Sequence, residues 1–392
     1  MNGGMELYLH MPFCVRKCAY CDFLSFPTDQ ETQNLYTRRL REDIDAMGKK
    51  YGDIPVDTIF IGGGTPSVPD SALIVGIMEH VRKAFHVAEG AEISMEANPG
   101  TVTREKLTDY RRAGINRLSF GLQSANDREL KLLGRIHTWA EFLESFHLAR
   151  ECGFTNINID LMSALPGQTR ESWKDTLKRV TDLNPEHISA YSLIIEDGTP
   201  FGEKYGSEEG RKLLPDEDSE REMYHETKRF LRDCGYERYE ISNYAKPGKE
   251  CRHNIGYWTE VAYLGLGLGA SSYMEGCRFT NEKDLDKYLA LDFGEEDPEK
   301  RETALRKLWG QIEELSQAQR MEEFMFLGLR MLKGVSDVDF VRLFGVKMET
   351  VYGDVIRRLT ANGLLKKEEN NLALTEWGMD VSNFVLSEFL LG

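Results

Sequence analysis

Residues 10–23 read His10-Met-Pro-Phe-Cys-Val-Arg-Lys-Cys-Ala-Tyr-Cys-Asp-Phe23, a stretch that contains Cys14, Cys18 and Cys21. Thiolates this close on one loop can all turn toward a single metal centre. A closed structural zinc or iron–sulfur site uses four protein ligands. Three thiolates on a four-iron cluster leave one iron free to bind another molecule, much as a catalytic zinc keeps one open position. The spacing therefore predicts a cluster that takes part in chemistry.

The main alternative for these cysteines is one half of a structural zinc site. Such a site would need a second Cys-x-x-Cys or Cys/His pair, and the sequence shows none. A disulfide framework is disfavoured because the chain is large and begins without a recognisable signal peptide. The other cysteines are scattered singly, at Cys152, Cys234, Cys251 and Cys277.

Length and composition indicate a globular protein with a large core. The 392 residues are enough for two domains, and a hydrophobic content of 41% is ordinary for a folded chain. No apolar run approaches the roughly 20 residues that span a bilayer, and the first residues lack the regions of a leader peptide. We therefore expect a cytoplasmic protein. The net charge of −16 argues against general nucleic-acid binding, which needs a basic face.

The first two-thirds of the chain alternates short apolar runs with amphipathic helical patterns. The apolar runs are rich in Ile, Leu and Phe and too short for helices, so they predict strands. Repeated strand–helix units imply right-handed crossovers and a parallel sheet. We expect an α/β fold with a partial (β/α)6 TIM-like barrel, whose site lies at the C-terminal ends of the strands. The predicted strands are 7–10, 58–61, 92–96, 117–121, 156–162 and 187–195, and the predicted helices lie near 31–48, 70–85, 103–113, 138–151 and 171–183.

The last third of the chain is predicted to form a separate domain. We expect a barrel domain with an extension over 1–290, a linker over 291–316 and a C-terminal domain over 317–392. Helical patterns and one hairpin give the C-terminal domain a winged-helix-like character, and its acidity favours a protein or lid module over a DNA reader. The polar residues 201–222 are expected to form a loop before a helix near 217–234; in the C-terminal domain the helices are expected near 317–333, 336–344, 348–362 and 376–389, and the hairpin within 363–375.

Polar residues stand where the predicted strands end. The second strand runs into Gly62-Gly63-Gly64-Thr65-Pro66, whose glycines can expose backbone groups to a ligand. The following strands lead to Glu96, Gln123 and Asp160, whose side chains suit hydroxyl and amino groups. Arg135 can form a forked contact with a carboxylate. Because these strand ends meet at one edge of a parallel sheet, we expect a site there, beside the cysteine loop.

Together these segments resemble the radical S-adenosylmethionine (SAM) superfamily, and within it the branch related to oxygen-independent coproporphyrinogen III oxidase. The resemblance covers most of residues 5–285, and the C-terminal domain is similar to the same branch. The motifs that carry it are Cys-x-x-x-Cys-x-Tyr-Cys at 14–21, Gly-Gly-Gly-Thr-Pro at 62–66, Glu-x-Asn-Pro at 96–99, Gly-x-Gln-Ser at 121–124, Gly-Arg-x-His at 134–137 and Asp-Leu-Met-x-x-Leu-Pro-Gly-Gln-Thr at 160–169.

The resemblance implies that the three cysteines hold a [4Fe–4S] cluster whose open iron binds the amino and carboxylate groups of SAM. An electron from the reduced cluster, delivered by a donor such as flavodoxin or ferredoxin, then splits the sulfonium into methionine and a 5′-deoxyadenosyl radical. By motif position, Tyr8, Gly64 and Glu96 are expected to contact the nucleotide. The other residues expected to line the site are Tyr20, Thr65, Gln123, Arg135, Asp160 and Ile194.

Two features favour one group within this branch. The oxidase motif continues with a further cysteine, where this sequence has Phe23. The segment His253-Asn254-Ile255-Gly256-Tyr257-Trp258 resembles the His-Asn-x-x-Tyr-Trp signature of related heme chaperones, in which this region is associated with heme binding. The resemblance thus implies a protein that binds heme and delivers it to acceptor proteins, with His253 as the expected heme ligand.

Alternatives remain for both the ligand and the function. His10, His137 and His187 are competing imidazoles, and Cys251 is an alternative thiolate ligand. The alternative functions are the oxidase itself, which decarboxylates coproporphyrinogen III, and another radical enzyme that modifies a tetrapyrrole. A peripheral contact with a membrane stays open, and the sequence gives no oligomeric state.

Overall fold

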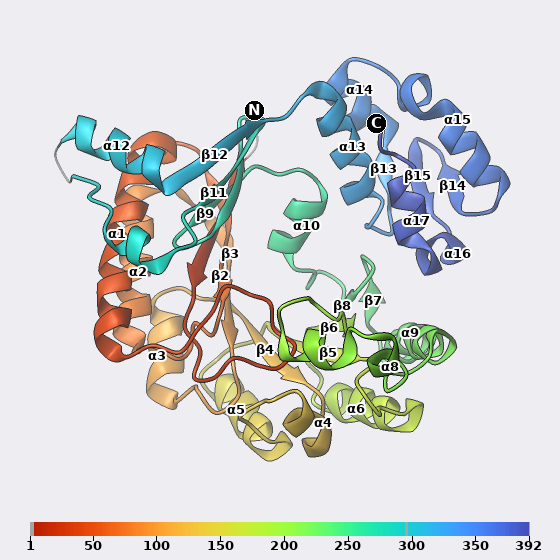
Figure 1. Cartoon of the computed structure of the whole chain (residues 1–392), viewed down its shortest axis with the longest axis horizontal. Coiled ribbons are helices and arrows are strands. Elements are labelled where there is room, and N and C mark those ends of the chain that lie inside the picture. Colours follow the sequence, from red (N-terminus) through yellow and green to blue (C-terminus); the bar gives the residue numbers. More distant parts are fainter. Residues whose placement is uncertain (1–3, 295–296, 392) are drawn as a thin grey trace.

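The computed structural model describes residues 4–294 and 297–391. Figure 1 shows a large sheet flanked by helices and, beside it, a smaller C-terminal domain. The six predicted strands and the five helices between them are present, so the predicted α/β fold is confirmed. The strands are β1 (Met5–Met11), β2 (Val56–Gly63), β3 (Val87–Ala97), β4 (Arg117–Gln123), β5 (Ile157–Ser163) and β6 (His187–Ser192). The helices are α1 (Gln30–Tyr51), α2 (Ser71–Ala84), α3 (Arg104–Arg112), α5 (Trp139–Glu151) and α6 (Arg170–Asp182), with a short α4 (Asp127–Leu132) before α5.

The barrel is partial because neither edge strand of the parallel set closes on the other. β1 to β6 are parallel and pair in chain order. Beyond β6 the sheet continues through β8 (Asn243–Ala245), which runs antiparallel to β6, and β7 (Glu237–Arg238). Beyond β1 it continues through β9 (Tyr263–Leu266), which runs parallel to β1, and then β10 (Ser271–Met274), β11 (Cys277–Asn281) and β12 (Trp309–Glu314).

Burial explains the apolar character of the central strands. In β1 the residues Met5, Leu7, Leu9 and Met11 are all fully buried, and such nearly continuous apolar runs are typical of parallel strands covered on both faces. The five long helices between these strands each begin at a residue whose side chain caps the first turn. In α5, for example, Thr138 and Glu141 form a reciprocal capping box.

Part of the segment predicted to be a linker is ordered structure that belongs to the sheet. Residues 291–316 contain α12 (Pro298–Leu308) and β12, and β12 pairs antiparallel with β11. The linker prediction rested on the acidic composition of this segment and missed an amphipathic helix. Leu305 and Leu308 of that helix are buried in the main core. The two residues 295–296 lie outside the described part of the chain.

The segment predicted to be a loop over 201–222 is also partly helical. It holds α7 (Pro200–Tyr205), α8 (Glu208–Arg211) and the start of α9 (Glu217–Asp233). The predicted helix near 217–234 is therefore confirmed, but the polar stretch before it is not one open loop. Two further helices connect the later strands, α10 (Arg252–Trp258) and α11 (Leu285–Leu289).

The C-terminal domain has its own hydrophobic core and a small antiparallel sheet. The predicted hairpin is confirmed, with a third strand added at its edge, and the predicted last helix is broken near Val381. The elements are α13 (Gln317–Gly328), β13 (Val335–Ser336), α14 (Asp337–Phe344), α15 (Met348–Ala361), β14 (Leu365–Glu368), β15 (Asn371–Leu374), α16 (Glu376–Asp380) and α17 (Ser382–Ser387). Among the described residues, no helix combines the length and the apolar character needed to cross a bilayer.

Candidate functional site

The cysteine loop follows β1 and is tied to two other parts of the chain. The backbone N–H of Cys14 donates to the carbonyl of Phe26 at 3.1 Å, which closes the loop at its base. The N–H of Ala19 donates to the carbonyl of Leu133 at 3.0 Å, just beyond α4. The loop is therefore fixed at the C-terminal ends of the parallel strands, where the fold predicts a site.

One cavity of about 470 Å³ collects the predicted site residues. All three cysteines line it, and so does every residue expected around the nucleotide except Tyr8. Tyr8 and His253 instead line an adjoining cavity of about 260 Å³ that shares part of its wall with the first. The predicted residues in the larger cavity are Cys14, Cys18, Tyr20, Cys21, Gly64, Thr65, Glu96, Gln123, Arg135, Asp160 and Ile194.

The glycine turn after β2 packs directly against the cysteine loop. The N–H of Gly64 donates to the carbonyl of Met11 at 2.8 Å, and the N–H of Thr65 donates to that of Phe13 at 2.6 Å. A Cβ atom on Gly64 would lie 2.6 Å from the Phe13 carbonyl oxygen, so a larger residue would push the two loops apart. Gly63 adopts a φ of +108°, which a side chain would disfavour. The third glycine of the motif is thus required by close backbone contact.

Two carboxylates form an acidic wall of the cavity. Glu96 accepts a hydrogen bond from the N–H of Gly63 at 3.0 Å. Burial, together with the nearby Asp160 carboxylate, raises the pKa of Glu96 to about 8. Burial also raises the pKa of Asp160, which accepts hydrogen bonds from Ser119 at 3.0 Å and Asn158 at 2.7 Å. These acceptors can pair with the hydroxyl and amino groups of a ligand.

Arg135 connects the cysteine loop to two strand ends. Its Nη2 donates to Oδ1 of Asn98 at 2.6 Å and to the carbonyl of Gly121, and its Nη1 donates to Sγ of Cys18 at 3.5 Å. Tyr20 lies beside it, and burial raises the pKa of that phenol above its usual range. The guanidinium therefore puts one positive charge next to a sulfur that is expected to bind metal.

The donor set of the cavity is compatible with an iron–sulfur cluster. In the part of the chain that the structure describes, no three Cys, His, Asp or Glu side chains are close enough to hold one metal ion. The three cysteines are free thiols facing one cavity, and thiolates are the ligands that iron–sulfur clusters use. Burial raises the pKa of the Cys21 thiol, so metal binding must displace its proton.

His253 does not have the free nitrogen that its predicted role requires. Its Nδ1 hydrogen-bonds with the hydroxyl of Thr58 at 2.7 Å, and its Nε2 with the hydroxyl of Tyr257 at 3.0 Å. The ring also stacks on Phe60, with centroids 5.2 Å apart. Burial and the nearby Arg117 lower the pKa of His253 to about 3. As placed, the imidazole is a neutral core group, and ligation of heme would require one of these hydrogen bonds to break.

The competing imidazoles and the alternative thiol are also enclosed. His10 and His187 each use both ring nitrogens in hydrogen bonds. His137 is buried, and burial together with Arg135 lowers its pKa to about 3. Cys251 is buried, with its Sγ 3.5 Å from a carboxylate oxygen of Glu92. None of these side chains lines the cysteine cavity.

Sequence reasoning missed several residues of the cavity wall. Asn98 accepts from Arg135 and donates to Thr65 at 2.8 Å, and its place at the end of β3 within Glu-x-Asn-Pro was the signal that pointed to it. Tyr191 at the end of β6 lines both cavities. Arg16, Lys17 and Phe23 also line the larger cavity, although at the level of sequence Phe23 served only to distinguish the chain from the oxidase.

Comparisons with known proteins give matches over nearly the whole chain. The radical SAM superfamily matches residues 8–180, and the HemN C-terminal domain family matches residues 315–381. The heme chaperone HemW of Bacillus subtilis is 35% identical over 384 residues, which cover 98% of each chain. The heme chaperone HemW of Escherichia coli is 42% identical over 272 residues, which cover 68% of this chain and 69% of the relative. The solved structure of E. coli coproporphyrinogen III oxidase (HemN), described as a radical SAM enzyme, has a TM-score of 0.84 and 25% identity, covering 99% of this chain and 90% of the oxidase.

Proposed function

Because this chain belongs to the HemW family of the radical SAM superfamily, we propose that it is a heme chaperone that binds heme and a [4Fe–4S] cluster with SAM and delivers heme to acceptor proteins. The observation that carries the proposal is the cavity that unites the three cysteines with the strand-end residues. Heme chaperones of the same family align with this chain along nearly its whole length.

Cys14, Cys18 and Cys21 are the proposed ligands of three irons. Arg135 supports Cys18 by donating a hydrogen bond to its sulfur, and such donors stabilise the negative charge of a thiolate. When bound, the cluster would supply the electron that cleaves SAM reductively. The chain's own contribution is to hold the thiols, keep the site enclosed and orient the nucleotide.

The strand ends are the proposed binding surface for SAM. The turn at Gly64 and Thr65 forms part of the cavity wall, and its close packing on the cysteine loop would hold the nucleotide site beside the cluster. Glu96 and Asp160 offer acceptors for the amino and ribose hydroxyl groups, and Arg135 offers a positive charge. We propose the same general role for Tyr8, Tyr20, Gln123 and Ile194.

A second candidate function is oxidative decarboxylation of coproporphyrinogen III. The structural similarity to the oxidase favours it, since the two folds agree over nearly the whole chain. Phe23 argues against it, because the oxidase motif continues with a cysteine at this position. We propose that the chain lacks this oxidase activity.

The two functions are separated by running two assays on one anaerobic preparation. In the first, the heme-loaded protein is mixed with an apo-acceptor, and heme is followed by its Soret band as it moves to the acceptor. In the second, coproporphyrinogen III and SAM are added with a reductant. We expect transfer in the first assay and no protoporphyrinogen in the second. Turnover of coproporphyrinogen without heme transfer would establish the oxidase instead.

The ligand assignment has its own matched control. Reconstitution should give about four irons and four sulfides per chain, as a [4Fe–4S] cluster requires. Cys18→Ala should lose them, whereas Cys234→Ala should keep them because Cys234 is exposed and lies outside the cavity. An intact cluster in Cys18→Ala would refute the assignment.

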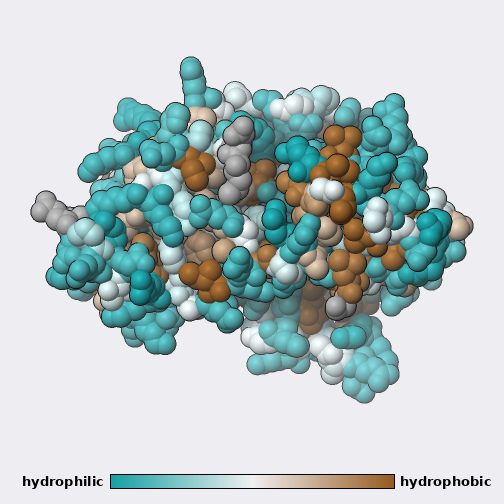
Figure 2. All heavy atoms as spheres, turned by 90° about the horizontal axis from the view of Figure 1, so that it is seen from above, coloured by the Kyte–Doolittle hydropathy of each residue, from teal (hydrophilic) through white to brown (hydrophobic). Residues whose placement is uncertain are grey.

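We also propose partners and a location for the protein. Flavodoxin or ferredoxin is the proposed electron donor, and the cytoplasm the proposed compartment. Exposed apolar side chains on the C-terminal domain support contact with an acceptor protein or a membrane surface. Figure 2 shows hydrophobic residues gathered over one half of the visible face of the molecule. Independently of that view, the exposed large apolar residues of the C-terminal domain include Val338, Val341, Leu343, Leu390 and Leu391.

A further inference from the structure

Two large apolar side chains stand exposed at the mouth of the cysteine cavity. Phe23 is 68% exposed and Ile194 is 69% exposed, and both line this cavity. They come from different parts of the chain, the end of the cysteine loop and the segment after β6. Exposed apolar groups gathered around a cavity commonly mark a binding surface. A flat apolar ligand resting on the mouth would remove both from water.

The position of Phe23 makes this surface specific to the chain. Phe23 stands where the oxidase motif has a cysteine, so an aromatic ring replaces a thiol beside the cluster loop. The same ring lines the adjoining cavity as well, which places it where the two cavities meet. An aromatic face of this kind packs well on the face of another ring system.

Positive charge lies on the same mouth, although the chain as a whole is acidic. Arg16 and Lys17 both line the cavity, in a chain whose net charge is −16. Arg16 is held in place by a hydrogen bond from Nη2 to the carbonyl of Gly134 at 2.8 Å. Asp22 and Glu196 also line the mouth. A ligand with two carboxylates on one edge can pair with the two cations while its apolar part covers the side chains beside them.

The iron of such a ligand would have no imidazole partner at this mouth. No histidine lines the cysteine cavity, and His253 uses both of its nitrogens elsewhere. Binding would therefore depend on the porphyrin ring and its propionates. An iron without a strong protein ligand is open to coordination by the protein that receives the heme, which suits a carrier.

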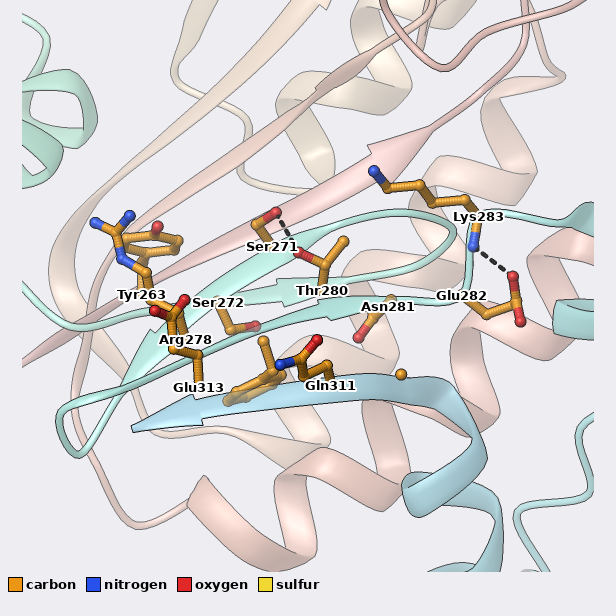
Figure 3. Close-up of a pocket in the computed structure, with 12 residues that line it drawn as sticks. Tyr263, Ser271, Ser272, Arg278, Thr280, Asn281, Glu282, Lys283, Gln311 and Glu313 are labelled. Atoms are coloured by element: carbon orange, nitrogen blue, oxygen red, sulfur yellow. Dashed lines mark hydrogen bonds between the residues drawn. The ribbon is translucent and has the colours of Figure 1, made fainter. Parts of the chain in front are cut away.

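A second pocket in the molecule does not offer a comparable apolar surface for a porphyrin. A polar groove of about 770 Å³ lies over β10, β11 and β12, at the opposite end of the sheet order from β6 (Figure 3). Its labelled side chains are almost all polar or charged, among them Arg278, Glu282 and Lys283. A porphyrin face would find little apolar contact there.

We propose that heme lies across the mouth of the cysteine cavity, flat against Phe23 and Ile194, with its propionates toward Arg16 and Lys17. This inference rests on the proposed chaperone function and gives its cargo a site. It assigns heme recognition to the ring and its carboxylates, and it places the cargo beside the cluster without using His253 as a ligand.

The test is a pair of anaerobic titrations of the cluster-reconstituted, full-length protein, one with heme and one with metal-free protoporphyrin IX. Both ligands should bind wild-type protein with affinities within about threefold of each other, because the iron contributes little. Phe23→Ala should weaken both by about tenfold or more, as loss of a central aromatic contact does. Phe384→Ala is the matched control, since Phe384 is 51% exposed but lies in α17, and it should bind like wild type.

Two further pairs test the rest of the surface. Ile194→Ala should weaken porphyrin binding, whereas Ile312→Ala, at an isoleucine in β12 that is 54% exposed, should not. Lys17→Glu should weaken binding more at low salt than at high salt, whereas Lys307→Glu in α12 should have no effect. Iron content and SAM affinity are measured for each variant, and Phe23→Tyr should restore binding, which separates loss of the ring from damage to the cluster loop.

The outcomes separate this inference from the proposed function. If wild-type protein binds no heme, the chaperone proposal fails and this inference fails with it. If wild type binds and transfers heme but Phe23→Ala binds it equally well, the chaperone stands and the site proposed here is wrong. If heme binds and protoporphyrin IX does not, the iron is ligated by the protein, and recognition through the ring is wrong.

Discussion

Arg135 joins three parts of the cavity wall through one side chain. Its fork reaches Asn98, the Gly121 carbonyl and Sγ of Cys18. A lysine has a single ammonium group and cannot make these three contacts at the same time. We expect Arg135→Lys to weaken SAM binding by at least about tenfold and to lower iron retention.

Calorimetry with SAM and iron analysis, both anaerobic, measure this effect. Arg150→Lys is the matched control, because Arg150 also makes a forked contact, with Glu186, but outside the cavity. If Arg150→Lys lost SAM affinity as strongly as Arg135→Lys, the effect would come from general destabilisation.

Both ring nitrogens of His253 are occupied, so a structural role can be tested against its predicted role as the heme ligand. Removing its ring would leave the hydroxyls of Thr58 and Tyr257 without their partner and open a cavity against Phe60. We expect His253→Ala to lower the free energy of unfolding by about 2–4 kcal/mol, measured by denaturant titration, and to change heme affinity less than about twofold. Should the variant fail to fold, His253→Gln gives the same comparison. A lost Soret band at unchanged stability would restore His253 as the heme ligand.

At the scale of elements, the sequence predicted what depends on local pattern. The strand–helix repeats were visible because each strand is an apolar run buried on both faces, and each long helix has a capped start and an apolar stripe. The strand ends then located the cavity, since parallel strands present them at one edge. Glu96, Gln123 and Asp160 come together there as expected.

The features that the sequence did not predict depend on pairing between strands that are far apart in the chain. β9 pairs with β1 although they are far apart in the chain, and β12 is held by β11 across an acidic segment. β9 has only four residues, and most side chains of β12 are exposed, so neither gives a strong local strand pattern. The hydrogen bond that occupies Nδ1 of His253 likewise comes from a distant residue, Thr58 in β2, which lies 195 positions earlier in the chain. No local pattern reports such contacts.

The fully buried Asp43 in α1 gives the structure a pH dependence that can be measured. Its carboxylate accepts from the N–H of Gly267 at 2.9 Å and from the hydroxyl of Tyr288 at 3.2 Å, and so anchors α1 near β9 and α11. Burial raises the pKa of Asp43 from 3.8 to about 7. The folded state therefore keeps a proton that the unfolded chain loses, and stability falls as the pH rises from about 4 to 7.

Asp43→Asn should remove this part of the pH dependence. We expect the decline in unfolding free energy between pH 4 and 7 to shrink by about 2–4 kcal/mol, as measured by denaturant titrations at several pH values. Glu6, with a pKa raised by burial to about 9, and Glu96 should leave a residual decline of the same sign. Asp218→Asn, at an exposed position in α9, should leave the decline unchanged. An unaltered slope in Asp43→Asn would contradict the assignment.

At the scale of the whole molecule, two hydrophobic cores are joined by polar contacts. Asp380 of α16 is central to this joint, with a side chain only 7% exposed. It accepts hydrogen bonds from Arg221 at 2.8 Å and 3.1 Å and lies 3.2 Å from His225, both in α9. On the other side of the joint, Arg330 stacks over the ring of Trp258 at 4.5 Å. Charged side chains thus contribute to holding the C-terminal domain against the barrel, together with a backbone hydrogen bond from Leu332 to the carbonyl of Tyr239 at 3.0 Å.

Removing Asp380 should loosen the joint without unfolding either core. Asp380→Ala leaves Arg221 without its carboxylate, so we expect faster hydrogen exchange in α9 and α16 and an earlier, separate melting transition for the C-terminal domain. Asp354→Ala in α15 is the control, because Asp354 is 96% exposed and its partner Arg357 lies in the same helix.

The same variant separates binding from delivery. The proposed heme site lies on the barrel, whereas the exposed apolar side chains proposed to meet the acceptor lie on the C-terminal domain. If the domain presents the acceptor to the cavity mouth, a loosened joint should leave heme affinity within about twofold of wild type and slow transfer by about fivefold or more. Stopped-flow measurement of the Soret change on mixing with apo-acceptor reports the transfer rate. Equal transfer rates for Asp380→Ala and wild type would show that delivery needs no fixed placement of the C-terminal domain.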